Sequence, residues 1–323
     1  MIENNSINIP NYNKLEIHYW FNDESHSMDA TLENKCAYEI IGIIKELAKI
    51  YDYQIVIETE PLETGGLRKW LKIISKEENK KATISTTILT ALITLVLVTP
   101  LQKITEKFVD KLFEDTELSQ LQKEKLQEEI KSLKLDNELK LLENPTIRKK
   151  KSNLYDALEK YPKIDKVSYQ VQDQDKKTLN NKFVYKKDFK AFILSTDELE
   201  PREIEDANIE IISPVLKKGN FKWSGYYQGE PIYFNMKSIE FKNLVQSGKI
   251  EFKNGSSINC ALIIKSKVDN DGLVKVFGYD VERVNYYFEN DKPIETKEGK
   301  RHRNKDKSQQ TNLFTYLDDE NIE

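Results

Sequence analysis

A cluster of aromatic and basic residues between positions 217 and 227 is the part of the chain whose residue types suggest chemistry most directly. The candidate ligand contacts in this cluster are Lys217, Lys218, Lys222, Trp223, Tyr226 and Tyr227, and the further aromatic residues Phe221, Tyr233 and Phe234 lie in or beside it. Aromatic rings stack on the bases of single-stranded nucleic acid, and ammonium groups neutralise its phosphates. In the alternative, the aromatic residues alternate along a strand, with one set in a core and the other in solvent. The sequence therefore predicts either a ligand-binding surface or an ordinary strand here.

A second pattern lies in residues 82–101, which contain no charged side chain. An α-helix of that length extends about 30 Å, which matches the hydrocarbon core of a bilayer. Four threonines fall on one face of such a helix: Thr83, Thr87, Thr90 and Thr94. In a membrane, this stripe lines a pore or a helix contact between several copies of the chain, so we expect a homo-oligomer.

Two alternatives to this interpretation stay open. Residues 82–101 contain six threonines, which makes a helix buried in a protein core a competing explanation. Threonine hydroxyl groups also bond back to carbonyl groups of their own helix, and are then tolerated on any face. Against the buried helix, the neighbouring sequence is rich in Lys and Glu and offers little apolar surface to enclose it.

Residues that commonly form catalytic or metal sites are scarce. The three histidines and two cysteines lack the spacing of a zinc site, and no glycine-rich phosphate-binding motif is present. His26 stands among acidic and hydroxyl residues that are able to support acid/base catalysis, but a single histidine at the start of a strand is more often structural. We therefore predict that the protein is not an enzyme and uses no metal or cofactor.

The surrounding elements predict an α+β fold. The expected segments are a small α/β domain (1–70), an amphipathic basic flank (71–81), a transmembrane helix (82–101), an amphipathic or coiled-coil helix (102–144), a β-rich sensor or binding domain (145–296) and a charged flexible tail (297–323). Leucines and isoleucines between 117 and 143 form an irregular heptad seam. That seam suits a coiled coil beside the membrane or a helix packed on the protein's own domains.

Charge and cysteine content restrict the setting in which the protein works. The 50 basic and 54 acidic side chains create no overall field toward nucleic acid or an anionic membrane, so any such attraction must be local. Two cysteines far apart in the sequence favour a reducing compartment, and the amino terminus lacks the pattern of a secretory signal. Within about 20 residues of the uncharged segment, six basic residues precede it and three follow it, which places the amino-terminal flank in the cytoplasm.

Several phrases of the sequence, taken together, resemble a known family. They are Ser25-His26-Ser27-Met28-Asp29, Gly65-Gly66-Leu67-Arg68, the uncharged residues 82–101, Ile212-Ser213-Pro214 and Gly219-Asn220-Phe221-Lys222-Trp223. The arrangement resembles the membrane channel effectors of Hailong-type bacterial antiphage defence systems. This resemblance implies a homo-oligomeric ion channel in the bacterial inner membrane, with cytoplasmic domains that sense a DNA oligomer made by a companion nucleotidyltransferase.

Three functional hypotheses follow. In the first, copies assemble in membrane lipid as an antiviral ion channel, and the carboxy-terminal domain gates it by binding a nucleic-acid or nucleotide signal. In the second, a membrane-tethered coiled-coil scaffold recruits a partner through the β-rich domain. In the third, the chain is a soluble nucleic-acid-binding protein whose helix 82–101 is buried.

Overall fold

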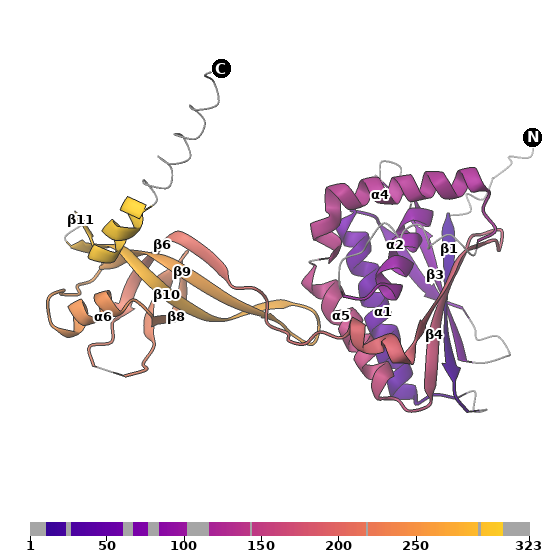
Figure 1. Cartoon of the computed structure of the whole chain (residues 1–323), viewed down its shortest axis with the longest axis horizontal. Coiled ribbons are helices and arrows are strands. Elements are labelled where there is room, and N and C mark those ends of the chain that lie inside the picture. Colours follow the sequence, from indigo (N-terminus) through magenta and orange to yellow (C-terminus); the bar gives the residue numbers. More distant parts are fainter. Residues whose placement is uncertain are drawn as a thin grey trace, which may run out of the picture. The chain divides into compact units, whose positions relative to one another are not determined.

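The computed structural model describes residues 11–23, 27–60, 67–76, 84–101, 116–142, 144–217, 219–289 and 292–305, with residues 133–142 and 289 as backbone only. The chain divides into two compact units, each with its own hydrophobic core (Figure 1). Unit 1 consists of Met1–Asp197 and Val268–Val274. Unit 2 consists of Glu198–Lys267 and Lys275–Glu323. Both units combine helices with sheets, which confirms the predicted α+β class.

Unit 1 contains a five-stranded sheet with the order β2-β3-β1-β4-β5, in which every neighbouring pair is antiparallel. The strands are β1 (Tyr12–Phe21), β2 (Ile55–Thr59), β3 (Leu67–Ser75), β4 (Ile164–Gln172) and β5 (Thr178–Tyr185). Strand β1 is central because Leu15 lies opposite Leu71 of β3 on one side and Val171 of β4 on the other. The sheet thus joins the start of the chain to residues 164–185, which the sequence assigned to a different domain.

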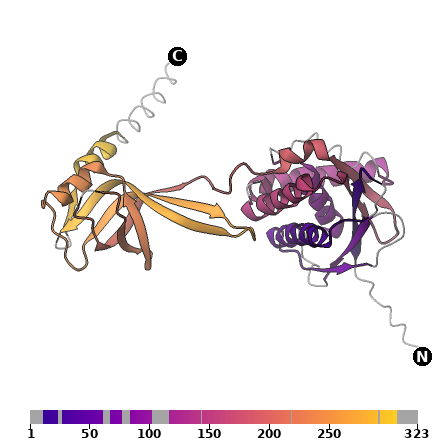
Figure 2. The same cartoon turned by 90° about the horizontal axis from the view of Figure 1, so that it is seen from below.

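Helices cover one face of this sheet (Figures 1 and 2). The helices of unit 1 are α1 (Ala30–Ile50), α2 (Thr86–Val98), α4 (Gln120–Leu142), α5 (Pro145–Lys160) and the 3-10 helix η2 (Lys186–Phe192). Asp29 caps α1, since its Oδ1 accepts a hydrogen bond from the Leu32 amide at 2.9 Å. Helical spacing then brings Ile40, Ile44 and Leu47 to one side of α1, where they are fully buried in the core of unit 1.

The predicted transmembrane helix is wrong. Helix α2 has 13 residues and is capped by Ser85, so it extends about 20 Å and is shorter than a bilayer core. It packs against the sheet, α1 and α4, and the side chains of Leu89, Ile93 and Leu97 are fully buried inside one copy of the chain. Among the residues that the structure describes, no helix is both long and apolar enough to cross a membrane. This finding overturns the predicted ion channel and the predicted location in the bacterial inner membrane.

Two members of the threonine stripe, Thr90 and Thr94, lie in the interior of unit 1. Thr90 Oγ1 accepts a hydrogen bond from Asn13 Nδ2 of β1 at 2.9 Å and donates to the Thr86 carbonyl at 3.0 Å. Thr94 Oγ1 donates to the Thr90 carbonyl at 3.1 Å. Both threonines are buried, whereas Thr87 is half-buried and Thr83 lies outside the described residues. The hydroxyl groups are therefore satisfied by their own helix and by the neighbouring sheet.

Helix α4 settles the alternatives left open for the heptad seam. Ile130 is fully buried in the core of unit 1, and Leu126 packs against the same core from a half-buried position. The contacts of α4 are with α2 and α5 of the same chain. The helix therefore packs on the protein's own fold, and the described residues contain no long coiled-coil helix; residues 102–115 lie outside them.

Unit 2 is a strand-rich fold with one helix between its third and fourth strands. Its elements include β6 (Arg202–Ser213), β7 (Trp223–Tyr227), β8 (Glu230–Met236), α6 (Ile239–Gln246), β9 (Ser257–Val268), β10 (Val274–Glu289) and β11 (Lys292–Glu295). Residues 297–305, expected as the start of a flexible tail, are helical as well. The strand order is β11-β10-β8-β7-β6-β9, and β9 also pairs with β10, so five of the strands close into a ring. Strands β8 and β10 are parallel. The enclosed core contains Trp223, Phe234 and Phe241.

Candidate nucleic-acid interface

Strands β7 and β8 form the hairpin on which the predicted aromatic residues lie. Its turn consists of Gln228 and Gly229, with positive φ values of 52° and 83°. Two positive φ values are typical of the tight two-residue turn that matches the twist of a hairpin, and glycine adopts the second at no steric cost. The hairpin that the sequence pattern predicts is therefore present, with Ser224 opposite Tyr233 and Tyr226 opposite Pro231.

The aromatic residues of the hairpin separate into two sets. Trp223 is 1% exposed and lies in the core, with its ring centroid about 6 Å from those of Phe234, Phe241 and Phe252. Tyr227 is also buried. These two predicted ligand contacts therefore stabilise unit 2 from inside, and a base has no access to them.

The second set faces outward. Tyr226 is 44% exposed and Tyr233 is 68% exposed, and they occupy diagonal positions on the outer face of the hairpin. Phe221, just before β7, is 64% exposed. An aromatic side chain that gains nothing from the core and stands in water provides a surface for stacking. Sequence reasoning included all three rings among the aromatic residues of this segment, but counted only Tyr226 among the predicted ligand contacts.

The loop between β6 and β7 supplies cations next to these rings. Lys217 and Lys222 are exposed, and Lys218 lies outside the described residues. Gln246 Nε2 of α6 donates a hydrogen bond to the Lys217 carbonyl at 3.1 Å, which ties the loop to the helix. The predicted lysines at 217 and 222 therefore carry their charge in solvent, and their role in binding a ligand stays a prediction.

A cleft of about 300 Å³ opens where the end of this loop meets β8 and α6. Its lining residues are Gly219, Asn220, Phe221, Asn235, Met236, Lys237 and Lys242. The Gly219 φ is 149°, and a Cβ there would lie 2.6 Å from the Phe221 ring, so only glycine lets that ring fold against the loop. Lys237 and Lys242 add two cations that sequence reasoning missed, because they follow the hairpin and lie apart in the sequence from the lysines at 217–222.

A polar network fixes Asn235 at the edge of this cleft. Its Nδ2 donates to Asp280 Oδ1 at 2.7 Å, and Lys265 Nζ lies 2.7 Å from Asp280 Oδ2. Burial by itself raises the pKa of the Asp280 carboxyl, but the hydrogen bonds from Lys265 and Asn235 outweigh that effect, so the pKa lies below its ordinary value. Asp280 is therefore a carboxylate at neutral pH and holds the amide of Asn235 in one orientation.

A larger groove, of about 1010 Å³, lies along the first part of the same loop. Its wall combines the apolar side chains of Ile212 and Leu216 with Tyr226, and it also carries charges of both signs on Glu251 and Lys253. Tyr226 thus stands between the hairpin face and this groove. Because its charges are mixed, the groove is less suited to phosphate than the lysine-lined cleft.

Metal and thiol chemistry has little support in the described part of the chain. No group of three His, Cys, Asp or Glu side chains there is placed to hold a metal ion. Cys36 and Cys260 are buried as free thiols, and burial raises the pKa of each to about 12, so neither is a reactive thiolate at neutral pH. His26, the predicted acid/base candidate, lies outside the described residues.

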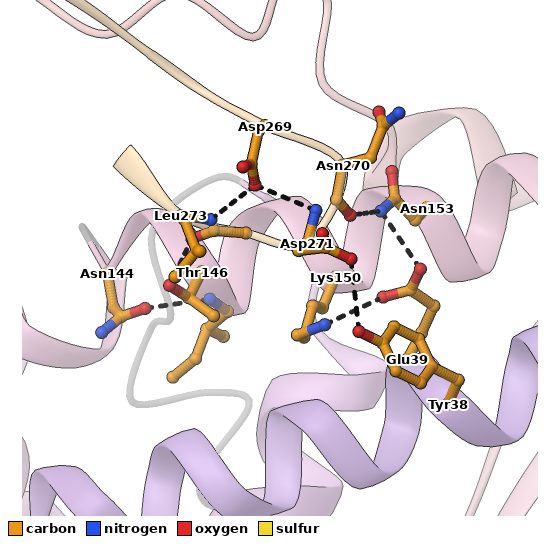
Figure 3. Close-up of polar contacts among 12 residues, drawn as sticks. Tyr38, Glu39, Asn144, Thr146, Lys150, Asn153, Asp269, Asn270, Asp271 and Leu273 are labelled. Atoms are coloured by element: carbon orange, nitrogen blue, oxygen red, sulfur yellow. Dashed lines mark hydrogen bonds and ion pairs between the residues drawn. The ribbon is translucent and has the colours of Figure 1, made fainter. Parts of the chain in front are cut away.

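Buried polar groups on α1 and α5 hold these two helices together (Figure 3). Lys150 Nζ of α5 lies 3.6 Å from Glu39 Oε2 of α1 and 4.5 Å from the centroid of the Tyr38 ring. Asn153 Nδ2 donates to Glu39 Oε1 at 3.2 Å. Burial raises the pKa of the Glu39 carboxyl, and Lys150 works against that rise. This pair joins α1 to α5.

Comparisons with known proteins add no family to this geometry. No family model matches the chain, and neither the curated proteins nor the solved structures contain a match to it.

Proposed function

We propose that unit 2 binds single-stranded nucleic acid across the outer face of the β7–β8 hairpin. Around the ring, the strands follow the spatial order β6-β7-β8-β10-β9, so the fifth strand in sequence lies between the third and the fourth. Helix α6 connects the third strand to the fourth, and the third and fifth strands are parallel. This is the arrangement of the oligonucleotide/oligosaccharide-binding (OB) fold, in which the second and third strands and the adjoining loops bind the ligand. The likeness is one of topology, so the function rests on the side chains.

The observation that carries the proposal is the pair of exposed tyrosines, Tyr226 and Tyr233, on the second and third strands. Diagonal neighbours on a sheet lie about 7–8 Å apart, which allows successive bases to stack on them. Lys222 directly precedes β7, Lys217 lies in the loop before it, and both are exposed, so they neutralise the phosphates. Binding of this kind tolerates many base sequences, because every base has a face that stacks.

The cleft beside Phe221 takes the end of a strand or a single nucleotide. Its volume of about 300 Å³ lies at the small end of ligand pockets. Lys237 and Lys242 face a phosphate there, and Asn235 supplies an amide for hydrogen bonding to a base. A DNA oligomer or nucleotide signal made by a companion nucleotidyltransferase is a ligand of this chemistry, and that assignment is part of the proposal.

Fluorescence anisotropy of the full-length protein with labelled oligothymidine and oligouridine tests the proposal. Replacing Tyr226 and Tyr233 together by Ala should weaken binding by at least tenfold, because stacking on an aromatic side chain contributes about 1–3 kcal/mol per base. Replacing Lys222 by Gln should reduce the slope of log affinity against log salt by about 0.7, the value for one phosphate contact on a single strand.

The matched control is Phe277→Ala, because Phe277 of β10 is 44% exposed, as Tyr226 is, and lies outside the hairpin. It should leave affinity unchanged. Undetectable binding at low salt, or equal affinity for the tyrosine double variant and the wild type, refutes the proposal. In that event the mixed-charge groove along the β6–β7 loop points instead to recruitment of a protein partner.

A further inference from the structure

The outer face of the unit 1 sheet carries an aromatic and basic patch next to its β5 edge. The side chains of Leu15, Ile17 and Tyr19 on β1 point toward the helices, so the alternate positions of the strand face the other way. Figures 1 and 2 show helices α1, α2 and α5 on the same side of the sheet. We call the group formed by Trp20, Lys166, Phe183, Tyr185 and Lys187 the β5 patch.

Strand register brings these residues together from three strands. Lys166 of β4 lies opposite Trp20 of β1 on one side and Tyr185 of β5 on the other. Its Nζ is 4.7 Å from the Trp20 ring centroid, 5.2 Å from that of Phe183 and 5.6 Å from that of Tyr185. The Lys187 Nζ lies 5.8 Å from the Tyr185 centroid. One ammonium group is thus held among three rings, with a second at their edge.

The rings are fixed in place and still accessible. Trp20 Nε1 donates to Ser168 Oγ at 3.0 Å, and the Trp20 ring stacks on His18 at a centroid distance of 4.1 Å. Phe183 is 41% exposed and Tyr185 is 45% exposed. Solvent-facing sheet positions are usually polar, so large rings that remain in water here indicate an interaction surface.

Charge distinguishes this patch from the rest of the same face. Elsewhere the cations are neutralised: Lys14 lies 2.8 Å from Glu60, Lys72 lies 3.7 Å from Glu58, and Arg68 lies 3.5 Å from Glu16. Within the described residues, no carboxylate pairs with Lys166 or Lys187. The patch therefore offers two uncompensated positive charges beside stacking surfaces, which is complementary to a phosphate chain with unpaired bases.

We propose that the β5 patch is a second binding surface for single-stranded nucleic acid, separate from the hairpin of unit 2. Sheets that bind single strands use the same device, with exposed rings on a sheet face for bases and nearby cations for phosphates. Phe183 and Tyr185 stack bases, while Lys166 and Lys187 neutralise the adjoining phosphates. The inference rests on unit 1 residues only and does not require the unit 2 surface.

Photo-cross-linking separates the two surfaces. The probe is an oligonucleotide that contains 5-iodouracil. Its length of about 20 nucleotides exceeds the site of a single module that binds single strands. It is irradiated with the full-length protein, and cross-linked peptides are identified by mass spectrometry. Cross-links to Phe183 or Tyr185 are expected, and they should persist in the Tyr226→Ala, Tyr233→Ala variant. Cross-links confined to residues 221–237, or none at all, overturn the proposal for unit 1.

Affinity measurements provide the second test. Replacing Phe183 and Tyr185 together by Ala should weaken binding about tenfold or more. Lys187→Glu should weaken binding and reduce the salt dependence, whereas Lys125→Glu, which changes the net charge equally at an exposed position of α4, should not. Thermal unfolding of each variant should match the wild type, because the replaced rings lie outside the core. Equal effects of the two charge reversals overturn the proposal.

Discussion

Lys151 is a buried lysine, and replacing it should change how the free energy of unfolding of unit 1 depends on pH. Its side chain lies on α5 inside the unit, only 5% exposed, and its Nζ donates to the Thr99 carbonyl at 3.0 Å. Burial, with a smaller contribution from the nearby Arg148 charge, lowers the pKa of this amine to about 7. Thr99 is the C-cap of α2, so the carbonyl lies at the negative end of the helix dipole and partly offsets the cost of burial.

The sign of the pH dependence follows from proton binding. Between pH 7 and about 10.4 the unfolded chain holds a proton on this amine that the folded chain has lost, so stability rises with pH. The slope approaches 1.4 kcal/mol per pH unit, and the rise between pH 7 and about 8.5 amounts to about 1.5 kcal/mol. Below pH 7 both states are protonated, and the folded state bears the full cost of a buried charge.

The perturbation is Lys151→Met, which keeps the length of the side chain and removes its charge. The variant loses one hydrogen bond, about 1 kcal/mol, and it loses the pH dependence. The free energy of unfolding of unit 1 is measured by urea titration at several pH values from about 7 to 8.5. Hydrogen exchange in α5 identifies the unit 1 transition. The difference between wild type and variant should change by about 1.5 kcal/mol over this range.

The upper limit of the pH range is set by the thiols. Burial raises the pKa of Cys36 and Cys260 to about 12, so above their ordinary pKa they contribute with the opposite sign. Lys149→Met is the matched control, because that neighbouring lysine is ion-paired with Asp197 at 2.7 Å. It should retain the slope of the wild type. Parallel curves for wild type and Lys151→Met refute the reasoning.

Two further substitutions test packing. Trp223→Ala should lower the free energy of unfolding of unit 2 by about 3–5 kcal/mol, measured by chemical denaturation, because the ring is enclosed in the core; unchanged stability with lost nucleic-acid affinity would place Trp223 in the binding surface instead. Gly42→Ala should destabilise unit 1 by about 1–3 kcal/mol in thermal unfolding, because the new Cβ would lie 2.4 Å from Lys150 Cδ. Helix propensity alone predicts a gain of about 1 kcal/mol, so a stabilised variant contradicts the observed packing.

Local patterns in the sequence predicted the local elements well. The isoleucines and leucines of residues 37–48 have helical spacing, and helix α1 contains them. Alternating aromatic residues and the Gln228-Gly229 pair predicted the β7–β8 hairpin. These successes share a cause, because side-chain periodicity and turn chemistry act between residues that are close in the chain.

The sequence alone does not decide whether residues 82–101 enter a membrane or the core of a protein. A charge-free helix gains the same transfer free energy from lipid as from the interior of a protein, so composition does not distinguish the two. What distinguishes them is the sheet, in which β1 pairs with β4 from more than 140 positions later and forms the wall against which α2 packs. Local patterns contain no record of such a pairing.

The candidate sites divide in the same way. The sequence by itself determined that residues 217–234 combine rings with lysines and that alternate rings must face opposite sides. Only the tertiary structure decided that Trp223 faces inward while Tyr226 and Tyr233 face water, and that Lys237 joins Phe221 at one cleft. The β5 patch is likewise a product of register, since it unites Trp20 with Tyr185. Side-chain periodicity predicts that a strand has two different faces. Which face is buried, and against which element, depends on residues distant in the chain, so it follows only from the complete fold.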